Sequence, residues 1–509
     1  MQSKNEVVLI INLTDGSVEK KPYPMENTMT YGRLLALELL RQYGESRANR
    51  LDEGNAIALV PGLFTGNPAP SAGRMLLVTQ KDGNAGAQIC NITGNLPEAL
   101  GRNGIAAVVI CGRYGKENGI IRISGQEVQL ETLQGATGKD TGRIVRALRA
   151  VYGKNCAAVG IGPAGERKLS AAAVFSTYAE GYPEYYVPRT CVGDVFGAKG
   201  LRAVVVEEES QARTHTLWNT ENPECFEILA TELANRIRRN EICGNALPSY
   251  GAAILQSGLN DRTVFDQFSD ASVPEIQRMT EFDNIHHGCT PLCVIGCLNR
   301  HARRQRKIFT NPLAIETGAL IRKYFGIDDD ELTFRIVKQS EDLGISSAEY
   351  IENFRLYSEC IGETVTEESL IGGLDEIEKD SPEGRILGSG EVGLRMLYPD
   401  RMNNDAREER REPSEREKSL REQIVALDSL GFCIFTAFAI IDNSESWKLL
   451  AKMTEARLGG DWTEQKLMEQ SRKSLQMEAD FSRVQAEAKA GTEIPGFASV
   501  LEQYREMKK

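Results

Sequence analysis

The pattern of apolar residues changes at about residue 208, and this change limits the possible folds more than any other feature of the chain. Before it, short β-branched runs alternate with Gly, Asn, Asp and Pro, a pattern typical of strands and turns. The runs are VVLIINL, NAIALVP, RMLLVTQ, IAAVVICG, NGIIRISG, CAAVGIG and LRAVVVEEE. Two helices are expected among them, TYGRLLALELLRQYG and TGRIVRALRAVYG. The pattern predicts a sheet-based domain over residues 1–208.

Long amphipathic segments dominate the rest of the chain. They include CFEILATELANRIRRN, DDELTFRIVKQSEDLG, SAEYIENFRLYSEC and WTEQKLMEQSRKSLQMEADFSRVQAEAKAG. The stretch from Asp400 to Glu422 is almost entirely polar and contains Pro413, which argues against one unbroken helix. We therefore predict an α+β protein with a β-rich domain over residues 1–208, a helical domain over 209–399 and a second helical domain over 400–509.

Composition and charge narrow the class of protein. The chain has 509 residues, 41% of them hydrophobic, which is enough for two to four domains with buried cores. The formal net charge of −12 argues against a broad nucleic-acid interface. No apolar run is long enough to span a bilayer, and the N-terminal segment MQSKNEVVLIINLTDG resembles a first strand more than a secretory signal. We expect a cytoplasmic protein without nucleic-acid partners.

Three cysteines stand within nine residues, in the segment His287-Gly288-Cys289-Thr290-Pro291-Leu292-Cys293-Val294-Ile295-Gly296-Cys297. Thiolates at this density can surround one metal centre, and the glycines and proline suit the tight turns that this requires. Both iron–sulfur clusters and zinc accept such ligands. The remaining cysteines other than Cys433 are scattered singly, as expected of small buried residues in a reducing compartment.

The identity of the metal depends on the fourth ligand. A histidine at His286, His287 or His301 would complete a zinc site, although structural zinc usually binds two short ligand pairs. Cys433, in DSLGFCIF, would instead complete a [4Fe–4S] cluster, in which a distant fourth cysteine is common. A third alternative is that the cysteines are inert core residues. We favour the [4Fe–4S] cluster.

A basic segment, Arg300 to Lys307, follows the cysteines directly. On an acidic protein, such a local positive patch beside an electron port could attract an acidic electron carrier such as ferredoxin. The alternative is an ordinary solvated loop.

Several motifs together resemble the tungsten-dependent aldehyde ferredoxin oxidoreductases. Members of this family have a β-rich N-terminal domain, two helical domains, a tungsten or molybdenum bis-pterin and one [4Fe–4S] cluster, and they oxidise aldehydes to carboxylic acids. The matching segments are the cysteine triplet, Pro61 to Gly66, Pro70 to Arg74, CNITGN, Gly162 to Glu166, Val192 to Leu201, PLAIET and DSLGFC.

The resemblance assigns roles on the N-terminal side. Arg74 would lie beside the pterin and the cluster. Asn91 would lie near the magnesium ion that bridges the pterin phosphates. Gly193 and Gly197 would let backbone N–H groups approach phosphates.

In the helical part, the resemblance makes Glu316 of PLAIET the residue that transfers a proton. Asp428 of DSLGFC would contact the pterin, and Cys433 would be the fourth cluster ligand.

The chain departs from the family pattern at several places. The first cysteine spacing is three residues, where the family usually has two, and bulky residues from Tyr185 to Cys191 replace a small, glycine-rich stretch. Ser346 stands where the family has a pterin-binding carboxylate. The family's second pterin loop has no counterpart, since the charged stretch from Asp400 to Glu422 takes its place, and no histidine follows His301.

Two functions therefore follow from the resemblance. The first is an oxidoreductase that moves electrons from an aldehyde or related small molecule to a ferredoxin-like carrier or other redox subunits. Such an enzyme could assemble as a homo-oligomer or a hetero-oligomer. The second is a non-catalytic relative without the pterin metal centre, acting as an electron-transfer or scaffold subunit. A third hypothesis, a nucleotide site, rests on Gly160 to Gly165, which fits G-x-G-x-x-G.

Overall fold

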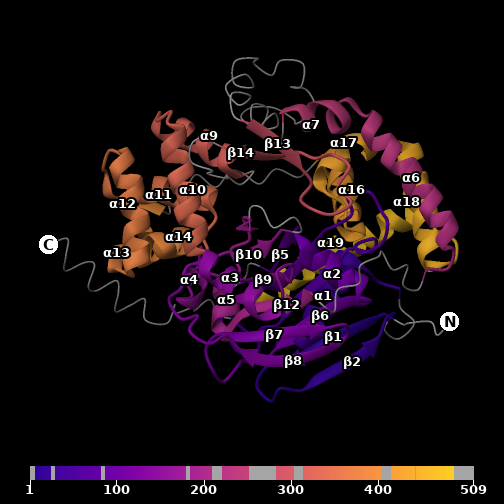
Figure 1. The fold of residues 1–509 in the computed structure, drawn as a ribbon, viewed down its shortest axis with the longest axis horizontal. Coiled ribbons are helices and arrows are strands. Elements are labelled where there is room, and N and C mark those ends of the chain that lie inside the picture. Colours follow the sequence, from indigo (N-terminus) through magenta and orange to yellow (C-terminus); the bar gives the residue numbers. More distant parts are fainter. Residues whose placement is uncertain are drawn as a thin grey trace.

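The computed structural model describes residues 6–24, 29–46, 48–81, 86–178, 184–208, 220–250, 283–302, 313–402, 414–441 and 443–486. A β-rich N-terminal region lies below two groups of helices, one on each side of the molecule (Figure 1). This confirms the predicted α+β class.

The first sheet has six strands in the order β2-β1-β6-β3-β4-β5. Its strands are β1 (Val7–Asn12), β2 (Val18–Pro22), β3 (Ile57–Pro61), β4 (Met75–Gln80), β5 (Ala87–Ile92) and β6 (Ile105–Cys111). Strands β1 and β6 are parallel, and the other pairs are antiparallel. Helix α1 (Gly32–Tyr43) packs its apolar face on this sheet through Leu35, Leu37 and Leu40.

The second sheet also has six strands, in the order β11-β10-β9-β12-β7-β8. These are β7 (Gly119–Ser124), β8 (Glu127–Thr132), β9 (Ala157–Ile161), β10 (Val174–Thr177), β11 (Tyr185–Tyr186) and β12 (Leu201–Val206). Helix α3 (Thr141–Tyr152) covers one face through Ile144 and Leu148. Near this sheet lie the short helices α4 (Pro163–Glu166) and α5 (Gly193–Ala198).

One core joins the two sheets face to face. It contains Leu9 and Leu77 from the first sheet and Val159 and Val204 from the second, all fully buried. Helix α2 (Asn95–Arg102) adds Leu96 to the same core. With α1 and α3 on the outside, the N-terminal region therefore has four layers. The two groups of helices lie above this region (Figure 1).

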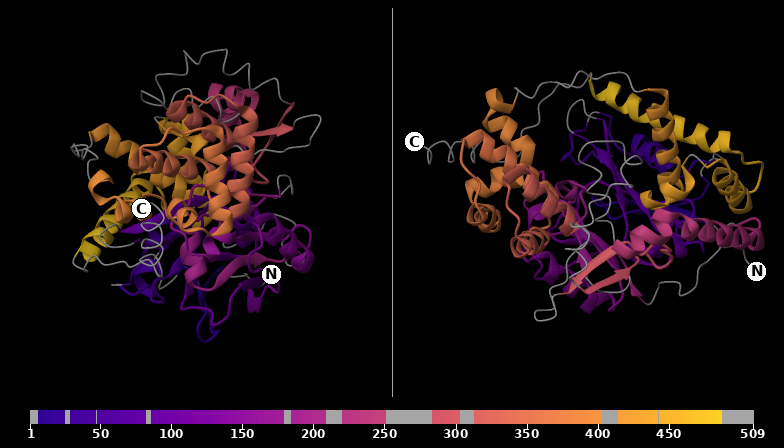
Figure 2. Two further views of the ribbon diagram at one scale, coloured as in Figure 1. Left: turned by 90° about the vertical axis from the view of Figure 1, so that its left-hand side faces the viewer. Right: turned by 90° about the horizontal axis from the view of Figure 1, so that it is seen from above.

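The first group of helices runs from α9 to α15. It comprises α9 (Leu313–Phe325), α10 (Asp330–Leu343), α11 (Ser347–Ile361), α12 (Glu367–Lys379), α13 (Pro382–Gly388), α14 (Gly390–Leu397) and α15 (Pro399–Met402). Tyr350, Phe354 and Leu374 lie in its core. Seen from above, this group lies opposite the other helices (Figure 2).

The second group combines helices from two parts of the sequence. It contains α6 (Pro223–Arg239), η4 (Ile242–Ala246), α7 (Leu247–Tyr250), α16 (Glu415–Leu430), η6 (Ile434–Thr436), α17 (Ala437–Ile440), α18 (Ser444–Leu458) and α19 (Glu464–Ala486). Helix α6 falls within the helical domain predicted over residues 209–399, yet its Phe226 and Leu233 share a core with Leu427 and Leu450 of the C-terminal helices.

The polar stretch from Asp400 to Glu422 is divided between two helices. Helix α15 ends at Met402, and α16 begins after Ser414, whose side chain forms a reciprocal capping box with Glu417. Residues 403–413 lie outside the described residues. The capping box explains why so polar a segment begins a helix, while its last turns carry the apolar residues that pack.

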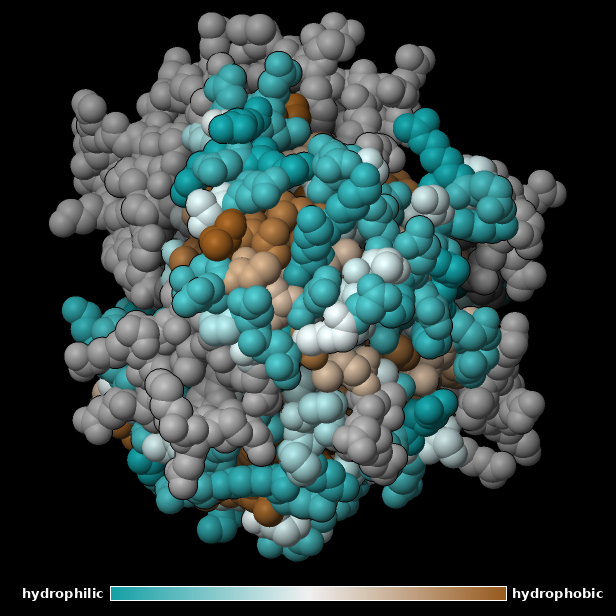
Figure 3. Space-filling view, turned by 90° about the vertical axis from the view of Figure 1, so that its right-hand side faces the viewer, coloured by the Kyte–Doolittle hydropathy of each residue, from teal (hydrophilic) through white to brown (hydrophobic). Residues whose placement is uncertain are grey.

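On the side where α6 and α18 lie, hydrophilic side chains of the described residues surround apolar areas (Figure 3). The large exposed apolar side chains are Val151 of α3, Ile228 of α6, Val392 and Met396 of α14, and Ile434 of η6. Single exposed apolar residues are normal on protein surfaces. Within the described ranges, none of the helices has the length and apolar character needed to cross a bilayer.

Candidate functional site

The cysteine triplet lies in the loop of a hairpin between the two groups of helices (Figure 1). Its strands are β13 (Asp283–His287) and β14 (Leu298–Ala302). Gly296 has a left-handed φ of +69°, and its N–H donates to Cys293 Sγ at 3.3 Å. The loop thus turns back on itself and gathers Cys289, Cys293 and Cys297.

The structure brings Cys433 to this loop through Ser71. Cys433 N–H donates to the Ser71 carbonyl at 2.9 Å, and Ser71 N–H donates to the Leu292 carbonyl at 2.9 Å. Ser71 Oγ also accepts the N–H of Val294 at 3.1 Å. One residue of the β3–β4 loop therefore holds both cysteine-bearing segments by backbone hydrogen bonds.

Arg74, at the end of the same loop, contacts two of the four sulfurs. Its Nη2 lies 3.3 Å from Cys433 Sγ and 3.9 Å from Cys289 Sγ. The backbone of Arg74 is fixed by its N–H, which donates to the Gly431 carbonyl at 3.1 Å. A cation in this position would stabilise thiolates on either side of it.

The glycines of the β3–β4 loop permit this close approach. A Cβ on Gly62 would lie 2.1 Å from Gly431 Cα, and a Cβ on Gly73 would lie 2.5 Å from Thr290 Cγ2. Any side chain at either position would push Arg74 away from the cysteines. The loop that resembles a pterin-contacting loop therefore also holds the cysteine-bearing segments together.

The four thiols affect one another electrostatically. Burial raises the pKa of Cys289 to about 11, and Arg74 opposes this rise, while Cys293 and Cys433 add to it. Burial also raises the pKa of Cys297 well above its ordinary value, and the other three cysteines add to the increase. Without a metal these two thiols are neutral, so a cluster would have to displace their protons when it binds.

Within the part of the chain that the structure describes, no three His, Cys, Asp or Glu side chains are close enough together to hold one metal ion. An iron–sulfur cubane contains several iron and sulfide atoms, so its thiolates are further apart than the ligands of one zinc ion. The side chains of the alternative zinc ligands, His286, His287 and His301, lie outside the described residues, as does most of the basic segment from Arg300 to Lys307.

Asn91 and Asp428 converge beside Arg74. Asn91 Nδ2 donates to Asp428 Oδ1 at 3.1 Å, and Arg33 Nη2 donates to Asp428 Oδ2 at 2.7 Å. Arg33 also binds Glu478 of α19 at 3.0 Å. Burial raises the pKa of Asp428, and Arg33 opposes the rise. Both oxygens of this carboxylate therefore have partners within the chain.

Gly193 and Gly197 face protein backbone. A Cβ on Gly197 would lie 1.9 Å from the carbonyl oxygen of Gly165 in α4, and a Cβ on Gly193 would lie 2.7 Å from the carbonyl oxygen of Ala173. Packing of α5 against these neighbours already accounts for glycine at both positions. Their predicted role at phosphates stays a prediction.

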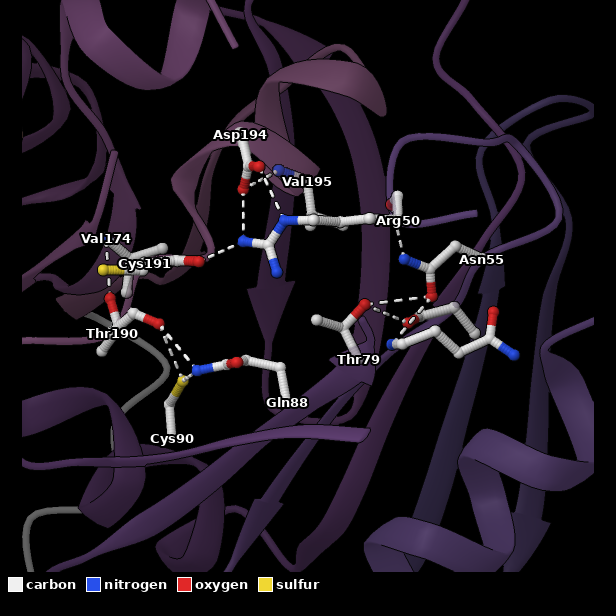
Figure 4. A network of polar contacts seen from close by, with 12 residues as sticks. Arg50, Asn55, Thr79, Gln88, Cys90, Val174, Thr190, Cys191, Asp194 and Val195 are labelled. Carbon is white, nitrogen blue, oxygen red and sulfur yellow. Dashed lines mark hydrogen bonds and ion pairs between the residues drawn. The ribbon is translucent and has the colours of Figure 1, made fainter. Parts of the chain in front are cut away.

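Asp194 and Arg50 form a buried ion pair at the start of α5 (Figure 4). Arg50 Nε and Nη2 donate to the two Asp194 oxygens at 2.7 and 2.6 Å, and Asp194 Oδ1 also accepts the N–H of Val195 at 2.9 Å. Arg50 donates in addition to the Cys191 carbonyl. A carboxylate of the chain itself thus stands in the first turn of α5, where an anion would otherwise be favoured.

The segment before α5 is held just as firmly. The Thr190 carbonyl accepts from Cys90 Sγ at 3.1 Å, and Thr190 Oγ1 accepts the N–H of Val174 at 3.1 Å (Figure 4). Cys191 has a left-handed φ of +45°, which is costly for a residue with a side chain. The hydrogen bonds on either side of Cys191 offset this strain.

The bulky residues before α5 also have defined neighbours. Tyr185 donates to Asp342 Oδ1 of α10 at 2.6 Å, and Tyr186 stacks on Tyr178 with ring centroids 4.9 Å apart. Cys289 packs against this stacked pair. Tyr178 and Tyr186 therefore line one side of the cysteine site.

Residues 8–208 match the aldehyde ferredoxin oxidoreductase N-terminal domain. The tungsten-containing aldehyde ferredoxin oxidoreductase of Thermococcus kodakarensis is 27% identical over 299 residues, covering 57% of this chain and 47% of that protein. The N-terminal region, residues 8–208, is thus similar to the N-terminal domain of the aldehyde ferredoxin oxidoreductases. The enzyme of Pyrococcus furiosus is 26% identical over 258 residues, which cover 50% of this chain and 41% of that protein. The matches thus span less than half the length of these relatives.

A likeness of fold extends beyond the matched region. A chain in the active site complex BamBC of benzoyl coenzyme A reductase, solved in complex with 1,5-dienoyl-CoA, superposes with a TM-score of 0.72. The alignment covers 99% of this chain and 94% of that chain at 16% identity. At this identity the likeness shows a common fold.

The described residues fit the family's cofactors unequally. Four cysteines, of which Cys289 and Cys433 contact Arg74, fit a [4Fe–4S] cluster in number and chemistry. Asn91 and Asp428 lie where a pterin beside Arg74 could reach them, after exchange of their present partners. At the start of α5, the Asp194 carboxylate is already paired with Arg50, so a pterin phosphate there would have to displace it.

Sequence reasoning missed Arg50, Arg33 and Thr93 at this site. Arg50 and Asp194 are 144 positions apart, and Arg33 and Asp428 are 395 positions apart, so no local pattern connects them. The only sequence signal for these contacts was Asp194, a carboxylate in the first turn of α5. Glu316 lies in α9, but its side chain is outside the described residues, so its role stays a prediction.

Proposed function

We propose that this chain is an iron–sulfur oxidoreductase whose [4Fe–4S] cluster is bound by Cys289, Cys293, Cys297 and Cys433. The observation that supports it is the pair of contacts from Arg74 to Cys433 and Cys289, at 3.3 and 3.9 Å. They join segments that are far apart in sequence, and a buried cation among thiols is explained by a metal centre that keeps them as thiolates. The cluster would carry electrons through the site.

The source of these electrons would be an aldehyde or a related small molecule. In the family, a tungsten or molybdenum bis-pterin with magnesium supplies the oxidation, and Arg74, Asn91 and Asp428 are the residues of this chain that would face it. Glu316 would accept a proton from the substrate. This part of the proposal is supported by the similarity of residues 8–208 to the family's N-terminal domain and by the 3.1 Å contact between Asn91 and Asp428.

The electron acceptor would be a ferredoxin-type carrier or another redox subunit. The fold is shared with a chain of a reductase complex, which supports the expectation of a redox partner. The basic segment Arg300 to Lys307 would favour an acidic carrier electrostatically, and this attraction would weaken as salt is added.

Metal analysis of anaerobically purified protein tests the proposal. We expect about four iron and four sulfide per chain, as a [4Fe–4S] cluster requires. The variant Cys433→Ser should lose most of the iron and the visible absorption of the cluster. The matched control Cys360→Ser removes a buried cysteine of α11 that is remote in sequence from the site, and it should retain both. Equal iron in the two variants would contradict the assignment of Cys433.

The same analysis decides how the cluster is used. Tungsten or molybdenum near one per chain, together with pterin, would support aldehyde oxidation. Iron alone would support the second function, an electron-transfer or scaffold subunit. Zinc in place of iron would overturn both.

A further inference from the structure

Thr93 places a hydroxyl group against a predicted cluster ligand. Its Oγ1 lies 3.3 Å from Cys289 Sγ, and the residue is only 5% exposed. Cys289 is the only acceptor that the structure, over its described ranges, gives to this hydroxyl. Because a hydroxyl carries a single proton, that proton is directed at the sulfur.

The backbone of Thr93 is held on both sides. Its N–H donates to the hydroxyl oxygen of Tyr186 at 3.0 Å, and its carbonyl accepts from Tyr186 at 2.9 Å and from Ser176 Oγ at 2.7 Å. Thr93 directly follows β5 of the first sheet, while Ser176 and Tyr186 belong to the second sheet. Two sheets thus fix one threonine.

Strand register explains how two side chains reach the same carbonyl. Ser176 of β10 and Tyr186 of β11 are direct partners in an antiparallel ladder, so their side chains leave the sheet on the same face. Tyr186 is further fixed by stacking on Tyr178, with an angle of 29° between the rings. Burial raises the pKa of Tyr186, which keeps its hydroxyl protonated and able to donate.

We propose that Thr93 is a redox-tuning residue of the cluster, and that Tyr186 positions it; this rests on the proposed function. Reduction adds an electron to the cluster and increases the negative charge on its sulfurs. A hydroxyl that donates to Cys289 stabilises the reduced form more than the oxidised form, and so raises the reduction potential. Since Thr93 is already held in place, it needs no reorganisation when the electron arrives.

A redox titration of three variants, monitored by the electron paramagnetic resonance signal of the reduced cluster, tests this inference. Thr93→Val keeps the shape but removes the hydroxyl, and it should shift the potential to a more negative value without loss of iron. Thr93→Ser restores the hydroxyl and should titrate close to the unmodified protein. Tyr186→Phe should shift the potential in the same direction as Thr93→Val, by a smaller amount.

The outcomes separate this inference from the proposed function. If the unmodified protein holds no iron–sulfur cluster, the proposed function fails and Thr93 has nothing to tune. If the cluster is present and Thr93→Val titrates at the unmodified potential, the tuning role is wrong while the cluster stands. Should Thr93→Val lose its iron, Tyr186→Phe decides, because an unchanged potential in that variant would overturn the positioning role.

Discussion

Glu98 is a buried carboxyl group whose ionisation should destabilise the fold. It lies in the first turn of α2, is 3% exposed, and accepts a backbone N–H from Gly66. Over the described residues, its Oε2 has no hydrogen-bond partner, and Arg102 Nε is 3.6 Å away. Burial raises the pKa of Glu98 to about 7, against the opposing effect of Arg102. The variant Glu98→Gln keeps the neutral form at every pH.

The magnitude follows from the change in pKa. Each unit of pKa corresponds to about 1.4 kcal/mol, so a rise from 4.5 to about 7 corresponds to roughly 3 kcal/mol. As pH increases from 4.5 to 7, the unfolded chain loses the Glu98 proton while the folded chain keeps it, so the free energy of unfolding falls. Above pH 7 both forms are ionised, and the loss is complete.

Urea unfolding of the two proteins at pH 5.5 and pH 8.5 measures this effect. Glu98→Gln should be more stable than the unmodified protein at both values, and its advantage should grow by about 2 kcal/mol between them. Other ionisable groups act equally in both proteins, so only the difference matters. Glu117→Gln, at an exposed position, is the control and should show no such growth. An advantage that does not change with pH would refute the reasoning.

Three further substitutions test the contacts that hold the site together. Gly62→Ala forces a Cβ against Gly431 and should lower the thermal unfolding temperature and the iron content together. Asp194→Ala leaves Arg50 buried without its carboxylate and should cost about 3–5 kcal/mol in urea unfolding, whereas a loss below 1 kcal/mol would show that the pair is unimportant. Arg74→Gln removes the cation beside two sulfurs, so the cluster should reduce at a more negative potential in a redox titration, with an unchanged potential as the contrary result.

The sequence predicted the features that depend on local patterns. The β-branched runs before residue 208 form β1, β3, β4, β6, β7, β9 and β12, and the amphipathic segments after it form helices. The glycine of DSLGFC ends α16, because Gly431 adopts the left-handed conformation that the helix end requires, with a φ of +94°. Such signals lie within a few residues and need no knowledge of the rest of the fold.

Contacts between distant segments could not be predicted in the same way. Thr93 and Cys289 are 196 positions apart, and Arg50 and Asp194 are 144 apart. Thr93 and Arg50 are ordinary polar residues by their own neighbourhood, and only the packing of two sheets and two groups of helices makes them partners of Cys289 and Asp194. The grouping of α6 with the C-terminal helices is of the same kind, since an amphipathic helix does not encode which core it joins.

Ser71 shows why the cysteine site and the docking of the helices should form together. It adopts a left-handed φ of +56°, is 2% exposed, and binds the hairpin loop and the segment of Cys433 through separate hydrogen bonds. Strain of this kind persists only where surrounding contacts determine the conformation. The hairpin and the end of α16 provide those contacts, so displacement of either would release Ser71 and with it Arg74. A cluster ligated by Cys433 and the triplet would lock the same joint covalently, and its binding energy would add directly to the stability of the folded chain.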